Sequence, residues 1–230
     1  MKKIVVLTGA GVSAESGLKT FRDSDGLWEG YDVTEVATPQ AWTKNRQLVL
    51  EFYNERRKQA MSAEPNTGHQ ALVSLQDAFE VSIITQNVDT LHEAAGSKHV
   101  IHLHGQLNKS RSTLDSNLVY DIDGWELNEG DTCERGSQLR PHIVWFGEAV
   151  PMMEPAIKET LEADIFIIAG TSLVVYPAAG LLDFVPANTP KYIVDPQMPE
   201  VGSAENMYFY EEAATSGLQK VRDHIIENHL

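Results

Sequence analysis

A glycine-rich turn near the N-terminus has the spacing of a phosphate-binding loop. Gly9, Gly11 and Ala14 match the pattern G-x-G-x-x-G/A and follow the apolar run Ile4–Leu7. Glycines at these positions let the backbone approach a pyrophosphate at the start of a helix. The alternative is a tight turn between a strand and a helix that binds nothing.

An ordinary dinucleotide site also needs an acidic residue at the end of a second strand, about 20 residues further on, to hold the ribose. The chain instead continues with Phe21, Arg22 and a polar stretch up to Trp28, which has the composition of a loop. We therefore expect an aromatic and arginine flap over the ligand. The alternative for Phe21 and Trp28 is a place in the core.

Small polar side chains follow two further apolar runs. Gln86, Asn87 and Asp89 come directly after the run Val81–Thr85. Such groups are costly to bury without partners, and they suit recognition of a carboxamide and of ribose hydroxyls. The alternative is a turn that caps the next helix. The run Ile165–Ala169 ends similarly in a small turn that can approach phosphate or ribose, formed by Gly170, Thr171 and Ser172.

Two histidines end another apolar run, Val100–Leu103. His102 and His104 are two residues apart, so an extended backbone places both side chains on one side. A histidine at a strand end is suited to act as a general base near neutral pH. The alternatives are a metal-binding pair and a hydrogen-bonded core histidine.

The segment Gln40–Met61 has helical periodicity and contains an inward arginine. Its apolar stripe consists of Val49, Phe52, Tyr53 and Ala60. Arg56 falls in the middle of this stripe, whereas Arg57 and Lys58 fall off it. A guanidinium on an inner face needs a carboxylate or phosphate partner. The sequence therefore indicates either a structural ion pair, an arginine that reaches out from the helix edge, or a Tyr53–Arg56 pair that grips an anionic ligand.

The elements that must position these residues alternate along the chain. Short apolar runs predict strands at Ile4–Leu7, Val81–Thr85, Val100–Leu103, Ile165–Ala169 and Tyr192–Val194. Helical patterns occupy Gln40–Met61, Gly68–Ala78, Met152–Glu162, Pro177–Phe184 and Leu218–Asn228. Because the strands are apolar throughout, the pattern predicts an α/β fold, with a Rossmann-like parallel sheet covered by helices on both faces.

Two stretches interrupt the alternation and predict a smaller inserted lobe. We expect the sheet domain to comprise residues 1–21, 67–105 and 141–230, and the insertions to comprise residues 22–66 and 106–140. In open parallel sheets, ligands bind outside the carboxyl ends of the strands. The turns described above therefore meet where a ligand is expected.

Composition narrows the classes of function. The chain has 230 residues, 18 Lys and Arg against 33 Asp and Glu, a net charge of −15, and a single cysteine, Cys133. This charge disfavours a nucleic-acid-binding face. One cysteine excludes an internal disulfide and a zinc site built from several cysteines. The apolar runs are far shorter than the ~20 residues of a membrane span, and the N-terminus does not match a signal peptide. We therefore expect a cytoplasmic protein.

Taken together, these motifs resemble those of the sirtuin family of NAD-dependent protein lysine deacylases. The resemblance covers nearly the whole chain and rests on six blocks in the family's order: residues 8–17, 20–22, 85–92, 102–105, 141–148 and 170–172. It is greatest to bacterial deacylases that also remove succinyl and other acidic acyl groups. Their Tyr-x-x-Arg pair matches Tyr53 and Arg56.

The resemblance implies a role for each matching residue. The NAD loop would comprise Gly9, Ala10, Gly11, Glu15, Phe21 and Arg22, and the nicotinamide and ribose pocket would comprise Gln86, Asn87 and Asp89. The phosphate or adenosine end would contact Gly170, Thr171, Ser172, Asp195 and Ala213. The run Val144, Trp145, Phe146, Gly147 and Glu148 would pair as a strand with the acyl-lysine peptide, unless it is an ordinary buried strand.

The implied reaction consumes NAD and transfers no hydride. The acyl oxygen attacks the ribose C1′ carbon as nicotinamide leaves, and His104 then deprotonates a ribose hydroxyl as the general base. The products are free lysine and O-acyl-ADP-ribose. Arg56 would pair with the carboxylate of an acidic acyl group. The implied partners are acylated lysine side chains of proteins, with no nucleic acid or membrane, and the expected state is a monomer.

The sequence also departs from the family pattern. The family holds zinc through cysteines between the His-Gly turn and the Pro-His-Ile-Val-Trp-Phe-Gly run, but here Lys109–Thr113 has serine at the first such position and only Cys133 follows. We therefore expect no metal and, in particular, no structural zinc. Gln106, Lys19 and Asp195 replace more usual Glu, Pro and Asn, and Asp195 near the adenosine would weaken NAD binding.

Three other functions remain open from sequence alone. A mono-ADP-ribosyltransferase could use the same NAD site. A non-catalytic NAD or ADP-ribose sensor would fit the missing zinc ligands and Asp195. A hydride-transferring dehydrogenase is the least consistent, because the ribose-binding acid on a second strand is absent.

Overall fold

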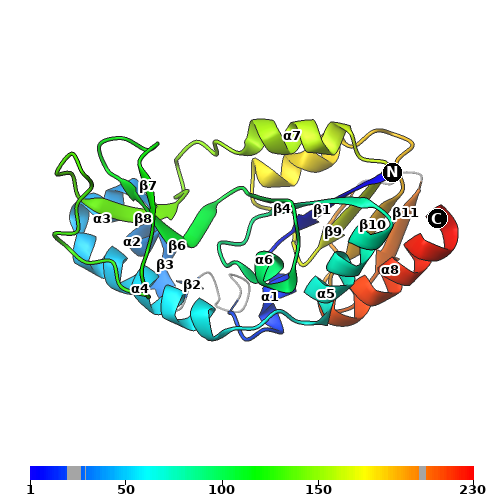
Figure 1. The fold of residues 1–230 in the computed structure, drawn as a ribbon, viewed down its shortest axis with the longest axis horizontal. Helices are drawn as coiled ribbons and strands as arrows, with labels where there is room; N and C mark the ends of the chain where they lie inside the picture. Colours follow the sequence, from blue (N-terminus) through cyan, green and yellow to red (C-terminus); the bar gives the residue numbers. More distant parts are fainter. Residues whose placement is uncertain (20–26, 29, 202–205) are drawn as a thin grey trace.

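A six-stranded parallel sheet forms the larger of two lobes (Figure 1). The computed structural model describes residues 1–19, 27–28, 30–201 and 206–230. The expected flap residues Phe21 and Arg22 lie outside them. The strands are β1 (Lys3–Thr8), β4 (Glu80–Thr85), β5 (Val100–His102), β9 (Ile165–Ala169), β10 (Lys191–Val194) and β11 (Met207–Tyr210). Their order is β11-β10-β9-β1-β4-β5, and every pairing is parallel. The predicted Rossmann-like α/β fold is confirmed.

The strand order places a topological switch point between β1 and β9. The chain runs outward from β1 through β4 to β5 on one side, and from β9 through β10 to β11 on the other. The loops that follow β1 and β9 therefore meet at one crevice. They meet closely, since a Cβ added to Gly170 would lie 2.4 Å from the Val12 nitrogen and the residue has a φ of +64°. Glycine is required at this approach.

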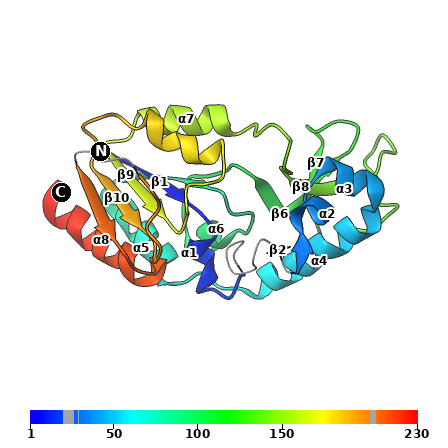
Figure 2. The same cartoon turned by 180° about the vertical axis from the view of Figure 1, so that it is seen from behind.

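Helices cover both faces of the sheet, as Figures 1 and 2 show from opposite sides. One face packs against α5 (Thr67–Ser74) and α8 (Ala214–His229) through a core cluster that includes Leu72 and Leu218. The other face packs against α7 (Met153–Leu161) and the 3₁₀ helix η3 (Ala178–Phe184). Three shorter helices connect strands: α1 (Gly11–Ala14), η2 (Leu75–Asp77) and α6 (Leu91–Ala95).

The smaller lobe has its own core. Its three-stranded antiparallel sheet, of order β7-β6-β8, consists of β6 (Gly105–Ser112), β7 (Val119–Asp121) and β8 (Leu139–Ile143). Beside it lie α2 (Val33–Val36), α3 (Pro39–Lys44), α4 (Arg46–Ser62) and a hairpin of β2 (Leu27–Trp28) and β3 (Tyr31–Asp32). A third hydrophobic cluster joins this sheet to α4.

The prediction of one helix over Gln40–Met61 is wrong at its start. Asn45 leaves the helical conformation, ends α3 and caps α4, because its side-chain oxygen accepts a hydrogen bond of 3.2 Å from the Leu48 nitrogen. Thr38 and Pro39 likewise begin α3 with a capping side chain and a first-turn proline. The capping residues thus divide a continuous apolar pattern into two helices.

Arg57 falls off the apolar stripe, as predicted, but it is nevertheless buried. Arg57 is 1% exposed. Its Nε donates to the Leu107 carbonyl at 2.5 Å, and its Nη1 donates to Asn54 Oδ1 at 2.8 Å and to the Trp125 carbonyl at 2.6 Å. Burial lowers the pKa of Arg57 to about 10. The second insertion packs along this flank of α4, so the helix is buried on more than the side that its apolar residues mark.

No helix among the described residues is long and apolar enough to cross a membrane.

Candidate active site

A cavity of about 510 Å³ opens where the carboxyl ends of the large sheet face the small lobe. Its walls come from the loops after β1, β4, β5 and β9, from α4, and from the segment after β8. The cavity brings together sixteen predicted residues: Gly9, Ala10, Tyr53, Arg56, Gln86, Asn87, Asp89, His104, Val144, Trp145, Phe146, Gly147, Glu148, Gly170, Thr171 and Ser172.

Four predicted cofactor residues do not line this cavity. Gly11 packs behind the wall, where its nitrogen donates to the Gly170 carbonyl at 2.9 Å. Glu15 instead accepts a hydrogen bond of 2.5 Å from Thr215 Oγ1, next to Ala213 at the start of α8. Asp195 is 1% exposed after β10, and its Oδ1 accepts from the Gln197 nitrogen at 2.9 Å.

A buried network orders the polar floor of the cavity. Asn87 Nδ2 donates to the Gly9 carbonyl and to Ser13 Oγ, both at 3.1 Å. Ser13 Oγ donates in turn to Asp89 Oδ2 at 3.0 Å. Sequence reasoning gave Ser13 no role of its own, although it stands inside the glycine motif. This hydroxyl links the loop after β1 to the loop after β4.

The protonation of Asp89 reflects its position in this network. Burial raises the pKa of the Asp89 carboxyl, against the hydrogen bonds from the Leu91 nitrogen and Ser13. Gln86 is held separately, because its Nε2 donates to Thr171 Oγ1 at 3.0 Å. The amide and carboxyl groups predicted for a polar ligand therefore stand in fixed orientations.

His104 has the hydrogen bonding expected of a general base. Its Nδ1 lies 3.1 Å from the Gln86 carbonyl oxygen. A carbonyl only accepts hydrogen bonds, so Nδ1 carries the proton and Nε2 keeps a lone pair. Burial lowers the pKa of His104, partly offset by the bond to Gln86. The imidazole is therefore neutral at pH 7 and able to take a proton.

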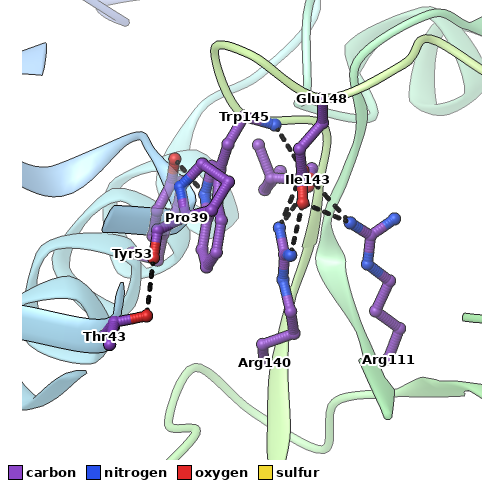
Figure 3. Close-up of polar contacts among 8 residues, drawn as sticks. All are labelled: Pro39, Thr43, Tyr53, Arg111, Arg140, Ile143, Trp145 and Glu148. Atoms are coloured by element: carbon purple, nitrogen blue, oxygen red, sulfur yellow. Dashed lines mark hydrogen bonds and ion pairs between the residues drawn. The ribbon is translucent and has the colours of Figure 1, made fainter. Parts of the chain in front are cut away.

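Tyr53 and Arg56 approach the cavity from α4. Tyr53 is fully buried and its hydroxyl accepts a hydrogen bond of 3.1 Å from Trp145 Nε1 (Figure 3). Burial raises the pKa of this phenol, so it stays protonated. Arg56 is half-buried, with its guanidinium carbon 5.8 Å from the centre of the Phe52 ring. Gln59 and Ala60, one helical turn further, line the same wall.

The segment Val144–Glu148 is not a strand. β8 ends at Ile143, and Phe146 and Gly147 form a turn. The Val144 nitrogen donates to the His104 carbonyl at 2.9 Å, and the Phe146 nitrogen donates to the Ala37 carbonyl at 3.0 Å. These bonds fix the segment to other loops, which is why it leaves the sheet. Phe146 remains 48% exposed at the cavity.

The side chain of Glu148 stabilises this turn through hydrogen bonds and ion pairs on its buried side (Figure 3). Its carboxylate accepts from Arg140 at 2.7 and 3.0 Å, from Arg111 at 3.2 Å, and from the Trp145 nitrogen at 2.8 Å. The pKa of Glu148 is lowered overall. Burial alone would raise it, but the hydrogen bonds from Arg140 and Trp145 and the charges of Arg140 and Arg111 outweigh that effect. Glu148 is therefore an ionised anchor of the segment.

The loops that join β6, β7 and β8 are held by hydrogen bonds. Ser112 Oγ accepts from the Leu114 nitrogen at 3.1 Å, and Cys133, 5% exposed, lies 3.3 Å from the same oxygen. Gln138 Nε2 donates to the Asn128 carbonyl at 3.0 Å. Among the residues that the structure describes, no group of three or more His, Cys, Asp or Glu side chains could hold a metal ion.

Comparisons with known proteins agree with this geometry. The Sir2 family model matches residues 9–177. Similar proteins include two named NAD-dependent protein deacylase. One, from Helicobacter pylori, is 51% identical over 229 residues and covers 99% of each chain. The other, from Bacteroides thetaiotaomicron, is 47% identical over 231 residues, which are 98% of this chain and 99% of the relative.

Solved structures extend the similarity to three dimensions. A Sir2 homologue in complex with NAD is 39% identical, with a TM-score of 0.88 over 98% of this chain and 90% of that one. A more distant Sir2 variant, solved with a deacetylated p53 peptide and 3′-O-acetyl ADP-ribose, is 28% identical with a TM-score of 0.79 over 98% and 93% of the two chains.

Proposed function

The chain belongs to the Sir2 family and is an NAD-dependent protein deacylase, and we propose that it prefers acidic acyl groups such as succinyl and malonyl. The observation that supports this preference is the placement of Arg56 and Tyr53 on the wall of the cavity that also contains His104. A guanidinium and a phenol in a partly desolvated wall favour a carboxylate over the methyl group of an acetyl substrate.

The residues of the cavity fit NAD. Backbone at the switch point, from the loops after β1 and β9, would hold the phosphates, and Gln86, Asn87 and Asp89 would hold the nicotinamide and ribose. NAD supplies the ribose carbon that receives the acyl oxygen when nicotinamide leaves. His104 is proposed to take the proton of a ribose hydroxyl at Nε2, while Nδ1 keeps its hydrogen bond to the Gln86 carbonyl.

The acyl-lysine peptide is proposed to bind along Val144–Glu148. The Trp145 and Glu148 side chains point into the protein, where Tyr53 and the two arginines hold them. Recognition of the peptide would therefore use the backbone of this segment and the exposed ring of Phe146. Such contacts select an extended chain more than a particular sequence.

An acyl panel tests the preference. Wild type and Arg56→Met are assayed with NAD and one peptide that carries acetyl-, malonyl- or succinyl-lysine, and nicotinamide release is measured. Arg56→Met should lose about 10²-fold in kcat/KM on succinyl-lysine, since a charge-assisted hydrogen bond contributes about 1.5–3 kcal/mol, and much less on acetyl-lysine. Equal losses on the two substrates would contradict the role of Arg56.

The basic activity has separate controls. His104→Ala should abolish turnover without loss of folding, and an unchanged rate would remove the general-base role. Label from NAD that stays on protein would favour a mono-ADP-ribosyltransferase, and NAD binding without turnover would favour a sensor. The substitution Arg46→Met is a matched control for Arg56→Met, because Arg46 lies on the same helix, its side chain is 40% exposed, and it does not line the cavity.

We also propose a cytoplasmic, monomeric protein that binds neither nucleic acid nor membrane and needs no structural zinc. The net charge of −15 supports the exclusion of nucleic acid. The division into a sheet domain and a lobe made of residues 22–66 and 106–140 is likewise a proposal. Ile143 and Trp145, just beyond the second insertion, also pack in the core of the small lobe.

A further inference from the structure

The end of β4 and the first residues of the turn after it are held by the end of β5 and the segment after it. Four consecutive carbonyl oxygens, of Thr85 to Val88, each accept a hydrogen bond from residues 102–107. The donors are the Leu103 nitrogen at 2.9 Å, His104 Nδ1 at 3.1 Å, His102 Nδ1 at 3.2 Å and the Leu107 nitrogen at 2.8 Å. Two of the four donors are histidine rings, so side chains as well as backbone set the orientation of these peptide groups.

The two rings differ at their other nitrogen. His104 lines the cavity, whereas His102 does not. His102 Nε2 lies 2.6 Å from Glu93 Oε1, with 8% of the His102 side chain exposed. The pKa of Glu93 is lowered overall, because the hydrogen bond and charge of His102 outweigh the effect of burial. This carboxyl is therefore ionised. The His102 ring therefore lies between two groups that accept hydrogen bonds, the Asn87 carbonyl and the Glu93 carboxylate.

Glu93 connects this ring to the rest of the site. It lies on α6, the short helix that follows Asp89, whose Oδ1 accepts from the Leu91 nitrogen at 3.1 Å. Other titratable groups whose charges act on this pair are Asp89, His92, Lys109 and His142. The turn is thereby held at Asp89 by α6 and at Asn87 by the His102–Glu93 pair.

We propose that His102 and Glu93 form a positioning pair that orients Asn87 for binding NAD, in addition to the catalytic role proposed for His104. His102 holds the Asn87 carbonyl, and Glu93 holds the ring in place. The Asn87 amide then keeps its bonds to the Gly9 carbonyl and Ser13 Oγ across the cavity floor. This inference rests on the proposed assignment of Asn87 to the nicotinamide and ribose pocket.

Two isosteric substitutions separate the two bonds of the ring. The amide nitrogen of asparagine can occupy the place of Nδ1, and that of glutamine the place of Nε2. His102→Asn therefore keeps the hydrogen bond to the Asn87 carbonyl and loses the one to Glu93. His102→Gln keeps the hydrogen bond to Glu93 and loses the one to the Asn87 carbonyl. Glu93→Gln keeps an acceptor for the ring and removes the charge.

The expected result is an ordered loss of NAD affinity. The Kd for NAD, measured by calorimetry without peptide, and the KM for NAD should rise about tenfold in His102→Gln, which corresponds to about 1.4 kcal/mol and thus to one hydrogen bond. In His102→Asn and Glu93→Gln, the Kd and KM for NAD should rise less, by about threefold. The KM for acyl-peptide and kcat at saturating NAD should stay close to wild type. His99→Ala, with a 56% exposed side chain near the start of β5, is the matched control.

Three outcomes would overturn the inference. One is a Kd for NAD in folded His102→Gln equal to that of wild type. The second is equal losses in the Asn and Gln variants. The third is a fall in thermal midpoint in all variants without any change in NAD affinity, which is the mark of a purely structural pair. If wild type binds NAD but does not release nicotinamide with any acyl-peptide, the proposed function fails, and the order of the Kd values still decides this inference.

Discussion

Replacing Glu148 with glutamine removes one charge from a semi-buried cluster and keeps the shape of the side chain. The carboxylate accepts two hydrogen bonds from Arg140, two longer ones from Arg111 and one from the Trp145 nitrogen. A glutamine amide has only one oxygen, so its NH₂ group must face an arginine donor. Glu148→Gln therefore leaves two guanidinium groups without their anion.

The expected cost follows from burial. The side chains of Arg140, Arg111 and Glu148 are 10%, 13% and 21% exposed. Loss of one partner from a buried ion pair costs about 3–5 kcal/mol, because the remaining charge stays desolvated. Since Glu148 keeps some contact with water, we expect a decrease of about 3 kcal/mol in the free energy of unfolding, at the lower end of that range.

Urea unfolding at pH 7 measures the change. The control is Glu154→Gln, because Glu154 and Lys158 form an ion pair of 2.9 Å with side chains 80% and 69% exposed. That variant should change the free energy of unfolding by less than about 0.5 kcal/mol. Midpoints for Glu148→Gln and Glu154→Gln that coincide would refute the reasoning, since they would show that the arginines do not need the carboxylate.

The pH dependence gives an independent test of the same cluster. The pKa of Glu148 is lowered in the folded protein, so its contribution to stability is complete above the unfolded pKa of about 4.3 and is lost as the pH falls through the folded pKa. The difference between wild type and Glu148→Gln should therefore be constant near pH 7 and shrink below about pH 4. A difference that grows in acid would contradict the assignment.

Further predictions concern the crevice, α4, the proposed base and the small lobe. Gly170→Ala should destabilise the protein by about 3 kcal/mol in urea unfolding, because its Cβ would lie 2.4 Å from the Val12 nitrogen at a φ of +64°. Arg57→Met should cost about 3 kcal/mol in the same assay, since it leaves buried acceptors without donors. The lowered pKa of His104 predicts that kcat/KM falls on the acid side only below the ordinary histidine pKa of about 6.5. EDTA should leave the thermal midpoint unchanged, and metal analysis of the purified protein should find no zinc beside Cys133.

The large sheet could be predicted from sequence because burial on both faces gives a continuous apolar run. Ile165–Ala169 is a strand with the predicted bounds, and the other four predicted strands differ by one residue at one or both ends. β11 was not predicted, because it is an edge strand whose Tyr208 and Phe209 are 39% and 53% exposed. An edge strand that is partly exposed lacks the continuous apolar run that marks the buried central strands.

The contents of the site could be predicted better than its internal contacts. The carboxyl ends of parallel strands converge, so the turns after β1, β4 and β9 had to meet whatever their side chains. The direction of Glu148 could not be predicted, since Arg140 and Arg111 reach it from two strands of the small sheet. An interaction of that kind depends on tertiary packing, for which the local sequence carries no signal.

The helix α4 shows which contacts helical periodicity can predict and which it cannot. Arg56 and Arg57 are consecutive, so their side chains leave the helix about 100° apart. Arg56 lines the cavity, whereas Arg57 donates three hydrogen bonds into the core of the small lobe. The apolar stripe located the face that Arg56 shares with Tyr53, but it could not show that the second insertion covers the adjacent face. Because Arg57 ties α4 to the carbonyls of Leu107 and Trp125, it fixes the rotation of the helix and thereby the direction from which Arg56 faces the cavity.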